Sequence, residues 1–329
     1  MKKTYVHAID VIRIVAILMV IVIHTSSKTL GVGNNDLLGM PLTFWFNQIT
    51  RGAVAIFIMI SGFVLEYGYN GNALDFYKKR ASRILTPYIF WSAIYYFFVY
   101  APNPNNFFLI LLIGGAAYQL YFIPSLLLFY LAFPWIRKIT SVKWLVLLSI
   151  VQLGWLYWDY SIKSLQSWGP ISIVLMNYLV FILGIMAARY QDKILKIVQK
   201  NSIYFVLMSV ISGSYVWLEG LGGYLNTNDY LAFYSQRRIS ILIYTIFLTA
   251  TLFYFFGKSF FTKTIFKTLS GLSFFVFFVH IIFLELIWTN SEIIHRPEYG
   301  LTLFILVTSL SFGSAWLVHR SRFLAKICG

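Results

Sequence analysis

The sequence carries little charge. Charged residues make up 11% of its 329 residues, whereas a soluble globular domain has about 25%. Hydrophobic residues reach 59%, above the roughly 45–50% of a soluble domain. This composition excludes a water-soluble globule, and the apolar residues suffice for about ten membrane-spanning helices of roughly 20 residues each.

Cysteines, linkers and nucleotide motifs are scarce or missing. Cys328 is the only cysteine, which excludes an internal disulfide and a metal site built from several cysteines. No Gly-, Pro- or Ser-rich linker and no long charge block marks off a second domain, so we predict one membrane domain over residues 1–329. There is no phosphate-binding Gly-x-x-x-x-Gly-Lys motif, and the five histidines lack metal-site spacing. We therefore expect neither ATP coupling nor a metal.

What the sequence has is a series of apolar runs separated by short polar breaks. Their lengths predict an all-α fold, a polytopic bundle of about ten transmembrane helices. The stretch 105–117 is apolar but too short to cross a bilayer, so we predict an interfacial or re-entrant segment there. The predicted spans are residues 9–25, 44–66, 84–100, 118–136, 142–158, 173–189, 203–219, 239–257, 269–289 and 301–318.

The basic residues predict the orientation. With the N-terminus inside, nineteen Lys and Arg fall in cytoplasmic segments, five in outer segments and two inside apolar runs. Because cytoplasmic loops carry the excess of basic residues, both termini are predicted to be cytoplasmic. The net charge of +15 is then mostly a topology signal, and we expect no nucleic-acid partner.

Ionisable residues inside the first predicted span are functional candidates, because a charge at bilayer depth costs several kcal/mol. Arg13 and His24 are eleven residues apart, which places them on one helix face about 16 Å apart along the axis. Asp10 lies one turn before Arg13 and is positioned to hold its guanidinium. The alternative is that Asp10 and Arg13 form an interfacial anchor and that His24 lies at headgroup level.

Two other predicted spans contain further candidates. Arg51 lies in the second span at a depth comparable with that of His24, where it needs a partner or a watery cavity. Ser61, followed by Gly62, is a small polar residue in a bulky run, for which close helix packing is the simpler interpretation. His280 lies midway along the ninth span, and a lone histidine in a bundle is more often a hydrogen-bonded core residue than a ligand.

A basic segment precedes the third predicted span. Arg80 and Arg83 are three residues apart, so on a helical approach both guanidinium groups reach the same phosphate. We expect the span itself to open at Thr86-Pro87, with the proline in its first turn. A cytoplasmic loop of any membrane protein is basic, so topology alone also explains this pair.

Taken together, these residues resemble the acyltransferase-3 family of bacterial integral membrane acyltransferases over nearly the whole chain. Ala55, Tyr121 and Phe277 depart from the pattern common in that family. The residues that carry the resemblance are Asp10 to Arg13 with His24, Arg51 with Phe57 to Phe63, Arg80 with Arg83, Leu120 to Phe122 with Tyr130 and Pro134, and Ser270 to His280.

The resemblance implies transfer of an acyl group, usually acetyl, from cytoplasmic acyl-CoA to a hydroxyl of a cell-envelope glycan or lipid-linked sugar at a bacterial plasma membrane. Acetyl-CoA is then the donor substrate, with Arg13, Arg80 and Arg83 as ligands of its phosphates. His24 acts as a general base or as a transient acyl carrier, and Asp10 joins it in the catalytic set. Arg51, Ser61 and His280 orient the acceptor or stabilise the oxyanion.

Two other functions are compatible with the sequence. A ten-helix bundle with buried charges also suits a transporter or flippase of a lipid-linked sugar or exopolysaccharide. A non-catalytic scaffold in an envelope-polymer complex is the second alternative. The sequence leaves the acceptor, the acyl chain length and the oligomeric state open, with a homodimer among the options.

Overall fold

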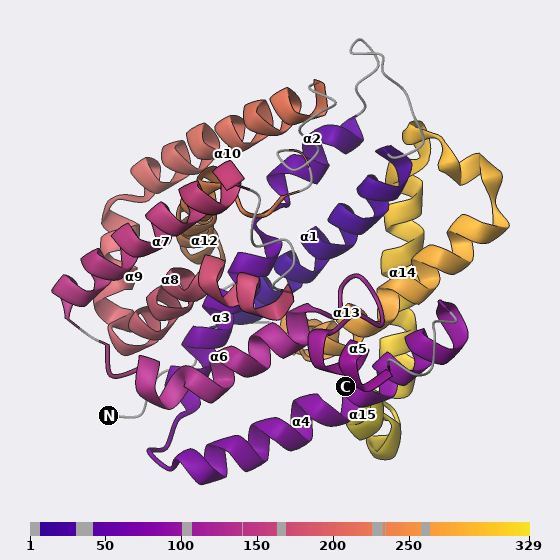
Figure 1. The fold of residues 1–329 in the computed structure, drawn as a ribbon, viewed down its shortest axis with the longest axis horizontal. Helices are drawn as coiled ribbons and strands as arrows, with labels where there is room; N and C mark the ends of the chain where they lie inside the picture. The colour runs from indigo at the N-terminus through magenta and orange to yellow at the C-terminus, as the bar shows by residue number, and fades with distance from the viewer. Residues whose placement is uncertain are drawn as a thin grey trace. The chain divides into compact units, whose positions relative to one another are not determined.

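The structure is a computed structural model that describes residues 7–30, 42–100, 107–139, 141–162, 169–225, 233, 235–257 and 264–329. Every regular element in this part of the chain is helical (Figure 1). The chain divides into two compact units, which we describe separately. One comprises Phe57–Lys196 with Val318–Gly329, and the other comprises the residues up to Ile56 with Ile197–Leu317.

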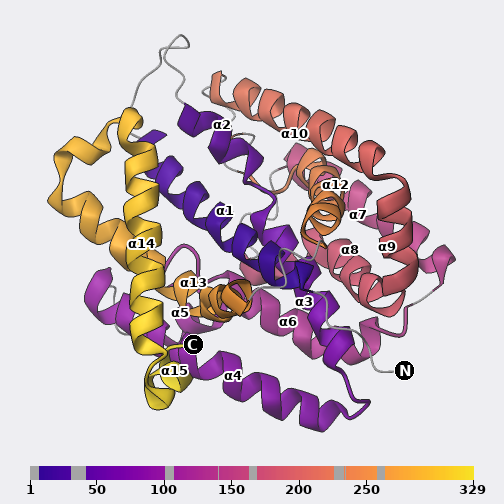
Figure 2. The same ribbon diagram turned by 180° about the vertical axis from the view of Figure 1, so that it is seen from behind.

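The unit that contains the N-terminal helix is built around α1 (Ala8–Leu30). This helix packs along α13 (Thr264–Asn290) and also contacts α2 (Leu42–Ile49) and α12 (Ile239–Phe256). Figure 2 shows α10 (Ser202–Leu225) alongside α12. The unit also holds α14 (Gly300–Val318) except its last residue, and the short 3-10 turns Glu292–His295 and Pro297–Tyr299.

The other unit contains α4 (Ala73–Ile94), whose end continues as a π-helical turn over Tyr95–Val99. Here α6 (Phe122–Ile136) and α7 (Val142–Ile162) both pack on α8 (Gly169–Arg189), and α15 (Arg322–Cys328) packs on α4. The Trp91 indole fixes this last contact by donating to the Cys328 carbonyl at 2.8 Å. Among the described helices, α3 (Ala53–Gly68) and α9 (Gln191–Lys200) also cross the boundary between the units, as does α14 at its last residue.

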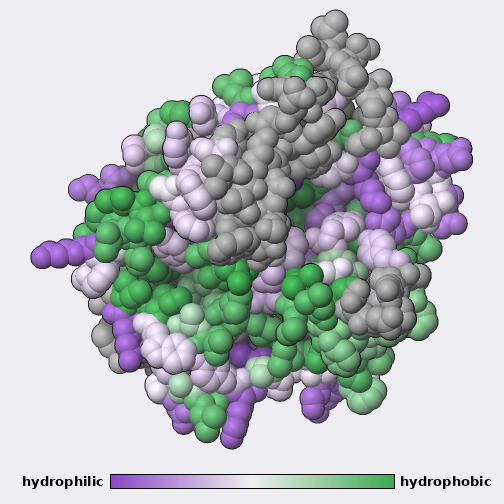
Figure 3. Space-filling model, in the orientation of Figure 1, coloured by the Kyte–Doolittle hydropathy of each residue, from purple (hydrophilic) through white to green (hydrophobic). Residues whose placement is uncertain are grey.

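The all-α membrane fold predicted from the composition is confirmed. Among the residues that the structure describes, seven helical stretches are long and apolar enough to cross a membrane, and α4, α6 and α7 lie in the three remaining predicted spans. Many large apolar side chains on these helices are exposed, for example Trp144, Leu147 and Ile150 on α7. Figure 3 shows such hydrophobic side chains over broad areas of the face in view, as expected of a surface that contacts lipid.

The second predicted span, residues 44–66, is not one continuous helix. It divides into α2 and α3, with a turn over Thr50, Arg51 and Gly52 between them. The Thr50 hydroxyl donates to the Phe46 carbonyl at 2.7 Å, and such back-bonding bends helices. Arg51 therefore lies in a turn rather than inside a helix, a correction that hydropathy alone does not supply.

The third predicted span begins earlier than expected. The Asn72 side chain caps α4 by accepting from the backbone N–H groups of Leu74 and Asp75, at 3.0 and 3.2 Å. Arg80 and Arg83 consequently lie within a helix, and Pro87 lies in its interior rather than in its first turn. The short segment expected near 105–117 is confirmed, because α5 (Phe107–Ile113) is too short to span a bilayer.

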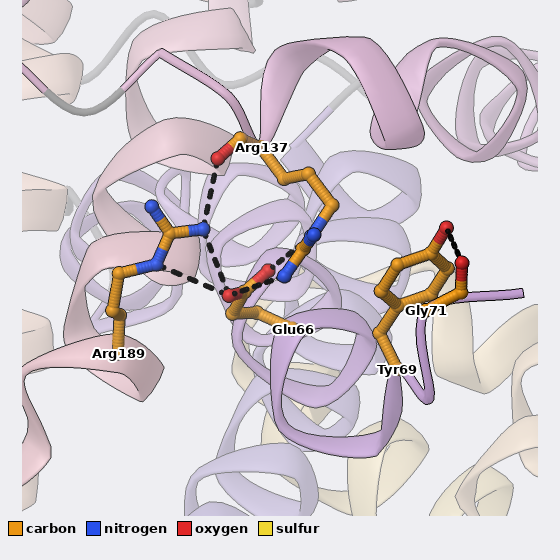
Figure 4. Close-up of polar contacts among 5 residues, drawn as sticks. All are labelled: Glu66, Tyr69, Gly71, Arg137 and Arg189. Carbon is orange, nitrogen blue, oxygen red and sulfur yellow. Dashed lines mark hydrogen bonds and ion pairs between the residues drawn. The ribbon is translucent and has the colours of Figure 1, made fainter.

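A buried carboxylate joins three helices at the end of α3. Glu66 is 4% exposed and accepts from Arg137 at the end of α6, at 2.9 and 3.0 Å, and from Arg189 at the end of α8, at 2.8 and 3.1 Å. Figure 4 shows the two guanidinium groups around this carboxylate. The guanidinium carbon of Arg137 also lies 4.5 Å from the centre of the Tyr69 ring. This fork geometry fixes the mutual position of the three helix ends.

Candidate functional site

Arg13 and His24 share one face of α1, and that face packs on α13. The Arg13 Nη1 donates to Ser270 Oγ at 3.1 Å, and the His24 ring lies 5.4 Å from the His280 ring, centre to centre. The two contacting residues are eleven positions apart on α1 and ten positions apart on α13, in the same chain order. The two helices therefore run in the same direction. This confirms the common face that helical periodicity predicted.

His280 is the more enclosed of the two imidazoles. It has no exposed surface, whereas His24 is partly exposed. Its Nδ1 lies 3.0 Å from the Val276 carbonyl, which is an acceptor only, so Nδ1 carries the proton. Its Nε2 is buried without a hydrogen-bond partner in the described part of the chain. The structure therefore places an acceptor nitrogen in the interior, beside the His24 ring.

Arg51 approaches the same pair from the turn between α2 and α3. It is 4% exposed and lies close enough to His24 for a Coulomb interaction. Its Nη2 donates to Asn47 Oδ1 at 2.5 Å, and its guanidinium lies 5.7 Å from the Phe233 ring. Two imidazoles and a fixed cation are thereby gathered at one place, which is a composition suited to proton transfer and to stabilising a developing negative charge.

A further ion pair ties α1 to α13 beyond the two histidines. Lys28 Nζ lies 2.8 Å from Glu285 Oε2 and 5.7 Å from the Trp288 ring. His295 stacks on that same indole with ring centres 4.1 Å apart. Together with Arg13–Ser270, this pair fixes the register of the two helices on both sides of the histidines.

The remaining predicted site residues occupy separate places. Asp10 is buried on α1, and its predicted contact with Arg13 stays a prediction. Arg80 and Arg83 lie on α4, where Arg80 is 6.0 Å from the Phe76 ring and Arg83 is exposed. Ser61 lies on α3 and is partly exposed. Ser61, Arg80 and Arg83 belong to the unit that does not contain the histidines.

Sequence reasoning missed three residues of the buried network around Arg51, namely Asn47, Gln48 and Arg238. Asn47 and Gln48 have no exposed surface and Arg238 is 1% exposed. The available signal was an Asn-Gln pair inside an otherwise apolar run. Arg238 gave no such signal, because it precedes an apolar run and reads as an ordinary outer-loop cation.

Within the described residues, no group of three or more His, Cys, Asp or Glu side chains is placed to hold a metal ion. Comparison with known proteins adds one finding. Residues 6–320 match the acyltransferase-3 family model, described as an acyltransferase domain. A search of curated proteins and a search of solved structures each returned no match.

Proposed function

Because the chain belongs to the acyltransferase-3 family, we propose that it transfers an acetyl group from acetyl-CoA to a hydroxyl of a cell-envelope glycan or lipid-linked sugar. The chain is a multi-pass membrane acyltransferase. The proposal adds its donor, its acceptor and its location in a bacterial plasma membrane. The observation that carries it is the contact between His24 and His280 on the face of α1 that also bears Arg13.

The donor occupies the cytoplasmic side in this proposal. Arg13 binds CoA phosphate through charge-assisted hydrogen bonds, and the predicted phosphate contacts of Arg80 and Arg83, which belong to the other unit, stay predictions. The pantetheine arm follows α1 from Arg13 towards His24, over about 16 Å, because each residue of an α-helix rises about 1.5 Å. This length suits an extended arm that presents its thioester to the imidazole.

Transfer requires that the acceptor hydroxyl loses a proton and that the thioester loses its thiolate. In the direct route the hydroxyl oxygen attacks the thioester carbon, its proton passes to His24, the C–O bond forms and the C–S bond breaks. In the alternative route a His24 nitrogen first takes the acyl group, and the hydroxyl then attacks the acyl-imidazole. Both routes release CoA, which is protonated on sulfur.

His280 and Arg51 support either route. A bare, buried Nε2 on His280 accepts a proton from His24 when the ring nitrogens face one another, since the ring centres are 5.4 Å apart. Arg51 is held where its charge acts on His24 and stabilises the oxyanion that forms as the thioester is attacked. No observation favours the transporter alternative over this reaction.

The proposal is tested with purified protein in liposomes, radiolabelled acetyl-CoA and an envelope-glycan extract. We expect label on the glycan, in proportion to the protein added. Glycan movement across the vesicle without labelling would instead identify a transporter, and neither labelling nor movement would identify a scaffold. A parallel assay with radiolabelled palmitoyl-CoA tests whether the enzyme transfers acetyl or longer acyl groups.

A further inference from the structure

The amide of Asn47, at the end of α2, has all its hydrogen-bonding positions occupied. Its Nδ2 donates to Ser26 Oγ at 2.7 Å and to Ser27 Oγ at 3.1 Å. Its Oδ1 accepts from Arg51 Nη2 at 2.5 Å and from Gln48 Nε2 at 3.1 Å. Because both ends of this buried amide are hydrogen-bonded, Asn47 holds Arg51 to the turn of α1 that follows His24.

The network continues from Gln48 to α10. Gln48 Oε1 accepts from Arg238 Nη2 at 2.8 Å, and Arg238 Nη1 donates to the Val216 carbonyl at 2.9 Å. Space for Gln48 is created by Gly220, because a Cβ there would lie 2.1 Å from Gln48 Oε1. A chain of side chains therefore connects α10 to Arg51 and to α1 beside His24.

We propose that Asn47 is a positioning residue that holds the Arg51 guanidinium at the His24–His280 pair during acyl transfer and, because its amide is neutral, leaves the Arg51 charge uncompensated there; this inference rests on the proposed function. Replacing a buried ion pair with apolar residues of equal volume is often neutral or stabilising, and by the same reasoning we assign this polar cluster in an apolar run to the position that it imposes on Arg51. An amide oxygen orients a guanidinium without adding a negative charge. An aspartate at the same position orients Arg51 equally well but opposes its field.

The closest test is therefore Asn47→Asp, which conserves shape. Both serine hydroxyls are able to turn and donate to the new carboxylate, Ser26 by giving up its bond to the Val22 carbonyl, while the long Nδ2 contact with the Ile23 carbonyl at 3.4 Å is lost. We expect kcat to fall by at least about tenfold, within the loss seen when an oxyanion-stabilising group is weakened, with the KM for acetyl-CoA unchanged within about twofold. Asn177→Asp, which also places a carboxylate at a buried amide position, is the matched control and should retain wild-type kcat.

A double-mutant cycle with Arg51 separates an effect on the position of Arg51 from an effect on folding. If Asn47 acts through Arg51, Asn47→Asp has no further effect on kcat in an Arg51→Gln background. An equal loss on both backgrounds, an effect confined to KM, or wild-type kcat in Asn47→Asp would each overturn the proposal.

A second measurement does not depend on activity. Asn47→Ala and Arg51→Ala should shift the thermal midpoint non-additively, and additive shifts would show that the contact carries no coupling. If the wild type transfers no acetyl group, the proposed function has failed, and this cycle still decides whether Asn47 holds Arg51.

Discussion

At the scale of single residues, the two nitrogens of His280 have different surroundings. Nδ1 contacts the Val276 carbonyl, whereas Nε2 is buried without a hydrogen-bond partner among the described residues, on a ring whose centre lies 5.4 Å from that of His24. The sequence identified His280 but offered no reason to pair it with His24, since the two lie 256 positions apart and no spacing signal links them. The Arg13–His24 face, by contrast, follows from the helical period alone.

His280→Asn tests the role of Nε2. An asparagine amide keeps the donor to Val276 and removes the inner nitrogen, so we expect kcat to fall by about 10²–10⁴, the range of general acid–base catalysis. Acetyl transfer by purified protein measures it, with His295→Asn as the control at a histidine that stacks on Trp288. Wild-type kcat in His280→Asn would show that Nε2 takes no part in the reaction.

Substitution of Arg83 distinguishes a role in binding the donor from a role in membrane topology alone. Arg83→Ala should raise the KM for acetyl-CoA by about tenfold or more, since a charge-assisted hydrogen bond contributes about 1.5–3 kcal/mol, and leave kcat nearly unchanged. Its neighbour Lys79 is also exposed on α4 and gives the matched control. If Lys79→Ala raises the KM for acetyl-CoA equally, Arg83 acts only as part of the basic cytoplasmic surface.

At the scale of elements, helix existence was predictable and helix continuity was not. Apolar runs revealed every long helix, because hydropathy reports burial in lipid. The break at Arg51 and the early start of α4 depend on single side chains, the Thr50 hydroxyl and the Asn72 cap, which hydropathy averages away. The break is what brings Arg51 out of a helix and against Asn47.

The crossing of α3 and α8 depends on two glycines. A Cβ on Gly184 would lie 2.0 Å from the Met59 carbonyl oxygen, and one on Gly62 would lie 2.2 Å from the Phe181 carbonyl oxygen. Gly184→Ala should therefore destabilise the protein by roughly 1–3 kcal/mol, the range of overpacked sites. Thermal unfolding in detergent measures it.

Gly154 on α7 provides the control for that substitution. A Cβ there meets nothing within 4 Å, so Gly154→Ala should be neutral or raise the thermal midpoint, because alanine favours a helix by about 1 kcal/mol over glycine. Equal midpoints for the two variants would mean that α3 and α8 are not in close contact.

At the scale of the whole molecule, the distribution of basic residues predicts that both termini are cytoplasmic. The shared direction of α1 and α13 agrees with their odd positions in the predicted order of spans. A C-terminal green fluorescent protein fusion should fluoresce and a C-terminal alkaline phosphatase fusion should be inactive. The reverse pair of results would invert the topology and place Arg13 on the wrong side for cytoplasmic acetyl-CoA.

Acetyl transfer by the His24→Ala variant tests the central claim most directly. All three proteins are purified and reconstituted in the same way. The wild type and a His295→Ala control should label the glycan from radiolabelled acetyl-CoA. His24→Ala should remain folded in the membrane and transfer no label above background. Labelling by His24→Ala at the wild-type rate would contradict the account, because the imidazole facing His280 would then have no part in the chemistry.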